Sequence, residues 1–187
     1  MVERSKDIIE GISIVLRLFE KAEAIIGIED NKPKAIDALS FECNGNNRIN
    51  VMPLSTRYPQ GGERRLISSV TGRQINSHIL PADAGVIVLN IATIIAIYEA
   101  VKMNMPLVHR VVTLTGDGVN EPGNMDVPLG ISHKYLADEC GGIKDSTVKI
   151  ISGGPMMGMA MNSLDYPVIK TSSSILAITH DLSLIHI

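Results

Sequence analysis

The first part of the chain alternates between apolar segments with helical and with strand-like periodicity. Over residues 7–22, apolar side chains recur every three or four positions, which predicts an amphipathic helix. The β-branched run at 24–28 (AIIGI) predicts a buried strand. A proline-led helix over 35–41 and a second strand over 48–54 follow. Strand, helix and strand at this spacing predict a βαβ unit with parallel strands.

The pattern then passes through a glycine pair into further elements. Gly61 and Gly62 precede a predicted helix that begins ERRLI. The apolar run GVIVLN at 85–90 predicts a strand that ends in a polar residue, and 91–103 predicts a helix. Pro106 ends this helix, and the character of the sequence changes there.

The second part of the chain has shorter strands separated by turn residues. We expect strands at 107–115, 125–129 and 148–151, and a helix over 132–140. The segment GDGVNEPGN between the first two strands is rich in turn-forming residues. Strand, turn, strand, helix and strand in this order predict a small β-grasp module. The predicted fold class is therefore α/β, with a Rossmann-like parallel βαβ layer followed by a β-grasp module.

Composition places the chain among globular proteins without a basic surface. Its 187 residues are 45% hydrophobic and 20% charged, enough for one ordinary domain or slightly more. Aromatic residues make up only 3% and Trp is absent, so Ile, Val, Leu, Met and Ala must build the core. The net charge of −3 gives no electrostatic basis for a nucleic-acid partner.

The cysteines and the apolar runs exclude further classes. Cys43 and Cys140 are far apart and lack CxxC spacing, which fits a reducing compartment and gives no iron–sulfur ligand set. The apolar runs are shorter than the roughly 20 residues of a membrane span, and the charged start MVERSKD does not resemble a signal peptide. The sequence has no P-loop, nucleophile elbow or metal-binding cluster, and His78, His109 and His133 are isolated.

The stretch YPQGGE is the first candidate binding site. Gly61 and Gly62 allow the backbone to approach a ligand without an intervening Cβ. Free N–H groups at the start of the following helix suit an anion or the polar edge of a heteroaromatic ring. The alternative is an ordinary glycine turn that leads into a surface helix.

Two further polar groups follow predicted strands. Glu29 and Lys32 come directly after the first strand, and in open α/β sheets ligands bind at the carboxyl ends of the strands. The alternative is a solvated helix cap. Asn90 and Thr93 stand at a strand–helix junction, where an amide and a hydroxyl can bind the polar edges of a flavin ring or a phosphate. Here the alternative is that Asn90 only caps the helix.

Three segments in the same order carry a family resemblance. YPQGGERRLI, LPADAGVIVLNIATIIAIYEAV and GGPMMG resemble the middle of the C subunit of the Rnf electron-transport complex, over residues 7–178. A more distant resemblance is to the flavin- and NADH-binding subunit of respiratory complex I. The Rnf resemblance implies electron transfer between ferredoxin and NAD(H), coupled to ion translocation.

The resemblance also implies site residues. The Asn-x-x-Thr that borders the flavin in the complex I protein matches Asn90 and Thr93, and its Tyr-x-x-Gly-x-Glu matches Tyr58, Gly61 and Glu63. Gly62 stands where the complex I pattern has an acidic residue. The implied cofactor-binding set, with Glu29 and Lys32 as outer members, is Tyr58, Gly61, Gly62, Glu63, Asn90, Thr93, Glu29 and Lys32.

The implied domains are an incomplete flavin- and NADH-binding core at 1–106, a β-grasp module of the SLBB type at 107–160 and a return segment at 161–179. We expect the tail at 180–187 to be foreign sequence. The segment GGPMMG is either a hinge that lines the flavin region or meets a partner, or a tight turn. The family's glycine-rich flavin loop and its [4Fe–4S] cysteine motifs are absent, so we expect a central fragment that is inactive alone and binds FMN weakly or not at all.

The resemblance assigns FMN, NAD(H) and [4Fe–4S] clusters to the parent protein. Its implied partners are ferredoxin and the other subunits of a membrane complex, and its implied place is the periphery of the cytoplasmic face of the membrane. The alternative function is a β-grasp module that binds a ligand or a partner without redox chemistry, because SLBB modules also occur in polysaccharide-export and cobalamin-binding proteins.

Overall fold

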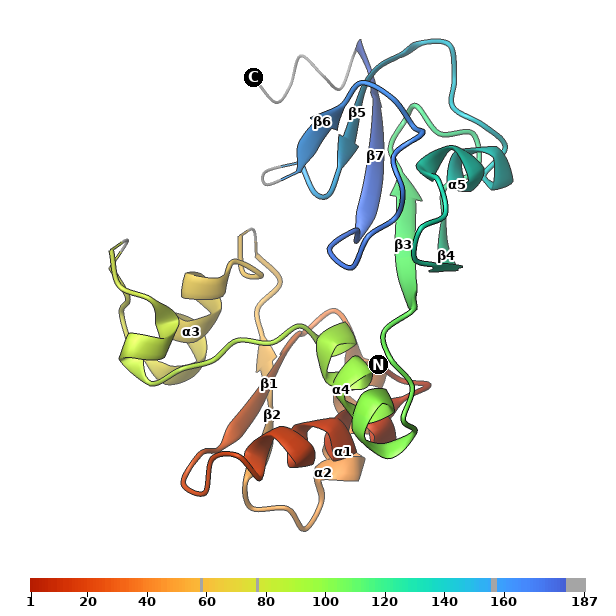
Figure 1. The fold of residues 1–187 in the computed structure, drawn as a ribbon. Helices are drawn as coiled ribbons and strands as arrows, with labels where there is room; N and C mark the ends of the chain where they lie inside the picture. Colours follow the sequence, from red (N-terminus) through yellow and green to blue (C-terminus); the bar gives the residue numbers. More distant parts are fainter. Residues whose placement is uncertain (58, 77, 156–157, 181–187) are drawn as a thin grey trace. The chain divides into compact units, whose positions relative to one another are not determined.

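The computed structural model describes residues 1–57, 59–76, 78–155 and 158–180. The chain divides into two compact units, Met1–Pro106 and Leu107–Ile187, and each unit contains a β-sheet and α-helical structure (Figure 1). The predicted α/β fold class is confirmed.

Unit 1 is built on two parallel strands and the helices that pack on them. Its elements are α1 (Ser5–Leu16), β1 (Ala24–Glu29), α2 (Pro33–Cys43), β2 (Ile49–Leu54), α3 (Glu63–Thr71), the 3-10 helix η1 (Pro81–Ala84) and α4 (Ile91–Lys102). Ala24 lies opposite Ile49 and Glu29 opposite Leu54 in the β1–β2 pair. The predicted parallel βαβ unit is therefore confirmed, and the carboxyl ends of both strands lie at the same edge.

The core of unit 1 lies between one face of this sheet and three helices. Buried side chains from α1, α2 and α4 pack with Ile26 and Ile28 of β1. Gly11 of α1 lies against α4 so closely that a Cβ at this position would be 2.5 Å from the carbonyl oxygen of Ile94. The other residues of this core are Ile8, Ile12, Leu16, Ala35, Leu39, Cys43 and Ile49.

The opposite face of the sheet holds α3. A Cβ on Gly27 of β1 would lie 2.9 Å from a methyl group of Leu66 in α3 and 2.9 Å from one of Leu54. Strand side chains alternate between the two faces, so Gly27 points away from Ile26 and Ile28. The missing side chain leaves room for α3 to pack on β1.

Arg48 explains why the first predicted helix ends early. We expected a helix over 7–22, but α1 ends at Leu16 and Phe19 is 43% exposed. The guanidinium group of Arg48 donates hydrogen bonds to the carbonyl groups of Leu16 (3.2 Å), Phe19 (2.5 Å) and Ala22 (2.8 Å). These bonds satisfy carbonyl groups after the last helical turn and stabilise the turn that leads into β1.

The prediction of a strand at 85–90 is wrong. These residues form no strand in the part of the chain that the structure describes. The N–H group of Val86 donates to the carbonyl of Pro81 at 3.0 Å, which closes the turn after η1 instead of joining a ladder. Ile87 is 60% exposed as a result.

Unit 2 is a mixed five-stranded sheet with one helix. Its elements are β3 (His109–Thr115), β4 (Gly123–Pro128), α5 (His133–Glu139), β5 (Thr147–Ser152), β6 (Met159–Met161) and β7 (Ser174–Thr179). The strand order is β4-β3-β7-β5-β6, and β3 pairs with β7 in parallel. The three predicted strands and the predicted helix are present, and the segment expected to return the chain contains the central strand β7.

Two glycine turns shape unit 2. Gly116 has a φ of +111°, and a Cβ there would lie 1.9 Å from the carbonyl oxygen of Ala177, so only glycine fits this turn. The segment GGPMMG joins β5 to β6 as a hairpin, and the N–H group of Gly158 donates to the carbonyl of Gly154 at 2.8 Å. Met156 and Met157 of this segment lie outside the described residues.

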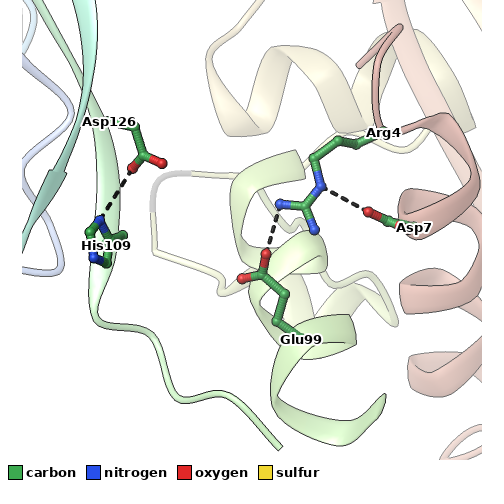
Figure 2. A network of polar contacts seen from close by, with 5 residues as sticks. All are labelled: Arg4, Asp7, Glu99, His109 and Asp126. Atoms are coloured by element: carbon green, nitrogen blue, oxygen red, sulfur yellow. Dashed lines mark hydrogen bonds and ion pairs between the residues drawn. The ribbon is translucent and has the colours of Figure 1, made fainter. Parts of the chain in front are cut away.

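Polar contacts in each unit are shown in Figure 2. The guanidinium group of Arg4 pairs with Asp7 at 2.8 Å and with Glu99 at 2.7 Å, so the start of α1 is tied to α4. In unit 2, His109 and Asp126 face each other from neighbouring strands, with 3.9 Å between imidazole nitrogen and carboxylate oxygen. These partly exposed pairs contribute little stability individually.

Candidate functional site

The edge where β1 and β2 end is held together by Asp30. The N–H group of Asp30 donates to the carbonyl of Leu54 at 2.8 Å, which is the last backbone bond between the two strand ends. The Asp30 carboxylate then accepts from the N–H group of Thr56 at 3.1 Å and from its hydroxyl at 2.7 Å. These bonds, the one from the Thr56 hydroxyl above all, hold the pKa of Asp30 below its usual value. The segment that follows β2 is therefore fixed to the end of β1.

The glycine loop continues directly from Thr56. Two turn bonds shape it, from the N–H of Gln60 to the carbonyl of Arg57 at 2.7 Å and from the N–H of Gly62 to the carbonyl of Pro59 at 2.9 Å. Gln60 is only 7% exposed, and its side-chain amide donates to the Ser69 hydroxyl of α3 at 2.9 Å. The buried amide of Gln60 thus anchors the loop to α3.

The tip of this loop is open. Among the described residues, a Cβ on Gly61 would have no neighbour within 4 Å, which leaves the backbone there open to a ligand. Gly62 has φ −66° and ψ 131°, a conformation that any residue adopts. Tyr58, the first predicted site residue, lies outside the described residues.

The loop ends at the N-terminus of α3. Gly62 is the N-cap, and no side chain of the described residues caps this end of the helix. N–H groups of the first turn of a helix attract anions and polar acceptors when no cap occupies them. Glu63, the first residue of α3, is exposed beside these groups.

The two outer candidates bind each other. Lys32 and Glu29 form an ion pair of 2.7 Å, and the N–H of Lys32 donates to the carbonyl of Glu29 at 3.0 Å. Both residues lie at the carboxyl end of β1, on the same edge as the start of the glycine loop. The Lys32 side chain is more than half exposed and remains accessible to an anionic ligand.

Asn90 and Thr93 begin α4. The side-chain oxygen of Asn90 accepts from the N–H of Ala92 at 2.9 Å, so Asn90 is an N-cap, as the alternative interpretation of the sequence held. This bond uses the oxygen and leaves the side-chain NH2 group without a hydrogen-bond partner among the described residues. Thr93 is exposed one turn further on. No hydrogen bond that the structure describes joins this pair to the glycine loop.

The structure adds residues that the sequence analysis did not select. Asp30, Thr56 and Gln60 fix the loop, and of these only Gln60 stood in a stretch that the sequence analysis singled out, YPQGGE. A polar residue directly after each of two parallel strands was the available signal for the Asp30–Thr56 contact. Nothing in the sequence indicated that Gln60 is buried.

Unit 2 has an open groove of about 410 Å³ between α5 and the segment after β6. Its floor is apolar, with Ala137, Ile150 and Leu164, and its rim includes the charged residues Lys134, Asp138 and Asp165. Within the described ranges, no three His, Cys, Asp or Glu side chains are grouped to hold a metal ion. His109 and His133 therefore have no metal-site geometry.

The first unit decides the family of the chain. A family model of the Nuo51 FMN-binding domain matches residues 1–99. The chain belongs to this family. A second family model, the SLBB domain, matches residues 111–160 in unit 2, which confirms the predicted β-grasp module.

Curated relatives agree with this assignment. The C subunit of the proton-translocating ferredoxin:NAD(+) oxidoreductase complex of Clostridium ljungdahlii is 46% identical over 179 residues, which are 96% of this chain and 39% of that protein. The C subunit of the Na(+)-translocating ferredoxin:NAD(+) oxidoreductase complex of Acetobacterium woodii is 38% identical over 97% of this chain and 41% of its own length. The corresponding subunit of the ion-translocating oxidoreductase complex of Yersinia enterocolitica is 37% identical, over 96% and 26%. The predicted resemblance to the C subunit of the Rnf type is confirmed. The chain spans about two fifths or less of these relatives.

Solved structures share the fold. The air-oxidised NAD+-reducing [NiFe]-hydrogenase superposes with a TM-score of 0.71 over 95% of this chain and 36% of the hydrogenase chain, at 15% identity. The H2-reduced state gives 0.72 over 92% and 36%, at 16% identity. At this identity the likeness concerns the fold alone. No helix in the described part of the chain combines the length and the apolar character needed to cross a bilayer.

Proposed function

We propose that this FMN-binding-family chain forms part of the flavin site in a subunit of an ion-translocating ferredoxin:NAD oxidoreductase complex. The observation that carries the proposal is the glycine loop, anchored at the carboxyl edge of β1 and β2 with an open backbone at Gly61. FMN fits this chain at the loop, because the Cβ position of Gly61 is free and the start of α3 carries no side-chain cap among the described residues.

Each residue of the proposed site has a separate role. Gly61 and Gly62 let the loop backbone lie against the ring, and the first N–H groups of α3 face its polar edge or a phosphate. Glu63 lies beside them, where a carboxylate accepts hydrogen bonds from the nicotinamide nucleotide. FMN, when bound, accepts two electrons as hydride and releases them singly.

The remaining members complete the edge of the site. The side-chain NH2 group of Asn90 and the hydroxyl of Thr93 donate to flavin oxygens or nitrogens. Lys32, held by Glu29, supplies a positive charge for a phosphate. Tyr58 is proposed as a member on the strength of the sequence motif alone.

Iron–sulfur clusters do not fit this chain. Cys43 and Cys140 are both buried, belong to different units and have no grouped partners among the described residues. We propose that clusters, ferredoxin contacts and the coupling to ion movement belong to other parts of the longer protein and its complex. The chain would sit peripherally on the cytoplasmic face, held by other subunits.

The test is a titration of FMN, then of NADH, into the 15N-labelled 187-residue chain, followed by NMR, which detects weak binding. We expect shifts of the amides of Gly61, Gly62 and Glu63, and of Asn90 and Thr93. The complete C subunit of Clostridium ljungdahlii, titrated in the same way, serves as the full-length comparison. Amides of the loop that stay unshifted at millimolar FMN would contradict the proposal.

The groove in unit 2 favours a second candidate function, binding of a ligand or partner without redox chemistry. A volume of about 410 Å³ lies in the range of small-ligand sites. The groove has apolar lining residues, and the two carboxylates of Asp138 and Asp165 outnumber the one ammonium group of Lys134, which suits an alkyl chain that ends in a cationic group. Titration with hexylammonium would then shift the α5 amides near Lys134 and Asp138, and Asp138→Asn would weaken this response. Unshifted α5 amides would exclude this ligand class.

A further inference from the structure

We propose that Asp30 and Gln60 are positioning residues for the flavin, because they fix the glycine loop in the shape in which Gly61 meets the ring. The inference rests on the proposed function. It concerns two side chains that hold the loop at two points, Asp30 through Thr56 at its start and Gln60 through Ser69 directly before Gly61.

Asp30 fixes the entrance of the loop. Its backbone N–H closes the β1–β2 pair at Leu54, and its carboxylate continues the contact two residues further, to the N–H and the hydroxyl of Thr56. An ionised acceptor with two donors from one residue defines the place of that residue more strongly than a single neutral bond. The short segment from Thr56 to Gly61 therefore starts from a defined point.

Gln60 fixes the loop just before its tip. Its side chain is buried under the loop and its amide reaches Ser69, further along α3. Because Gln60 precedes Gly61 directly, rotation of its side chain out of this site would move the tip. A buried amide that lost its partner would also be costly, which keeps Gln60 in place.

The same carboxylate arrangement occurs in unit 2, where it serves as an internal control. Asp117 accepts from the N–H group of Thr179 at 2.9 Å and from the Thr179 hydroxyl. There the contact ties the turn after β3 to the end of β7, away from the glycine loop in sequence and in a different unit. If Asp30 had only a structural role, loss of its carboxylate and loss of the Asp117 carboxylate would have the same kind of effect on stability and on FMN binding.

The experiment compares Asp30→Ala, Asp30→Asn and Gln60→Ala with Asp117→Ala in the 187-residue chain. Two quantities are measured: amide hydrogen exchange of Gln60 and Gly62, whose N–H groups form the two turn bonds of the loop, without ligand, and the dissociation constant for FMN by NMR. We expect Asp30→Ala and Gln60→Ala to speed exchange in the loop and to raise the dissociation constant about tenfold. Asp30→Asn keeps an acceptor oxygen, so its dissociation constant and its loop exchange rate should lie between those of the unsubstituted chain and those of Asp30→Ala.

Asp117→Ala should lower the melting midpoint and leave both loop exchange and FMN affinity unchanged. Unchanged affinity in Asp30→Ala and Gln60→Ala would overturn the inference, as would an equal loss in Asp117→Ala. If the unsubstituted chain does not bind FMN, the proposed function is wrong, and so is the inference that Asp30 and Gln60 position the flavin. Loop exchange would then still decide whether Asp30 and Gln60 fix the loop. If Asp30→Ala does not fold, Thr56→Val, which removes only the hydroxyl donor, takes its place.

Discussion

Among single residues, neither of the two loop glycines is required by its backbone conformation. Gly62 has an ordinary extended backbone, so its conformation does not need glycine. Gly61 does not have a positive φ either, and no described residue lies within 4 Å of its Cβ position. A side chain at Gly61 is therefore compatible with the fold and conflicts only with a ligand that approaches the backbone.

Gly61→Val should separate binding from folding. We expect an unchanged melting midpoint and a dissociation constant for FMN raised by at least about tenfold, because the isopropyl group occupies the space of the ring. The control is Gly123→Val in β4, whose Cβ position is also free, and which should leave FMN binding intact. Full FMN affinity in Gly61→Val would remove Gly61 from the site.

Glu63→Gln tests the nicotinamide contact. The carboxylate is exposed at the start of α3, so its loss should hardly affect stability. We expect the NMR-measured dissociation constant for NADH to rise about tenfold and that for FMN to change little. Glu20→Gln, in the exposed turn after α1, is the matched control. Reduced stability with unchanged NADH binding would make Glu63 only a helix-start residue.

Among the helices and strands, the packing of α1 on α4 depends on one glycine. Gly11 brings the backbone of α1 to the carbonyl of Ile94, and a Cβ would lie 2.5 Å from that oxygen. The ion pairs of Arg4 with Glu99 and of Glu10 with Lys102 at 3.5 Å join the same two helices from the surface. The close approach allows Ile94 to reach the core shared with β1.

Gly11→Ala should destabilise the chain although alanine is the better helix former. We expect a loss of about 2 kcal/mol of unfolding free energy, because the backbone oxygen of Ile94 cannot move without separating the helices. Urea denaturation gives the value, and Lys6→Ala, on the exposed side of α1, is the control. A stability equal to or above that of the unsubstituted chain would mean that the two helices do not pack this closely in solution.

Across the full chain, each unit contains an aspartate with a lowered pKa. Hydrogen bonds from Thr179, first its hydroxyl and then its N–H, lower the pKa of Asp117, as those from Thr56 do for Asp30. The unfolded chain, with aspartate pKa values of about 3.9, therefore binds protons before the folded chain does. The stabilisation is complete above the unfolded pKa and is lost as pH falls through the folded pKa.

This predicts a pH-dependent difference between the chain and its double variant Asp30→Asn, Asp117→Asn. The melting midpoints should differ by a constant amount between about pH 5 and 7. The difference should shrink as pH falls below about 4, because the unfolded chain then binds protons, and it should vanish once the pH is below the lowered pKa values of the folded carboxylates. Thermal denaturation followed by circular dichroism at several pH values measures both curves. A difference that persists unchanged down to pH 3 would contradict the assigned role of these carboxylates.

Local sequence signals were sufficient for the elements that depend on near neighbours. Periodic apolar residues predicted α4, a β-branched run predicted β1, and the predicted helix over 132–140 begins at Ser132, whose hydroxyl accepts from the N–H group of Tyr135 in α5. The family resemblance rested on motifs of the same local kind. These signals lie within a few residues of one another, so no knowledge of distant neighbours is needed.

Features that depend on distant partners became visible only in the folded chain. Arg48 ended α1 from a position 32 residues away in the sequence. The run at 85–90 had the pattern of a strand but found no neighbour with which to pair among the described residues, and a strand exists only as part of a ladder. The contacts of Asp30 with Thr56 and of Gln60 with Ser69, which fix the proposed flavin loop, arise because parallel strands end at one edge and α3 folds back over β1.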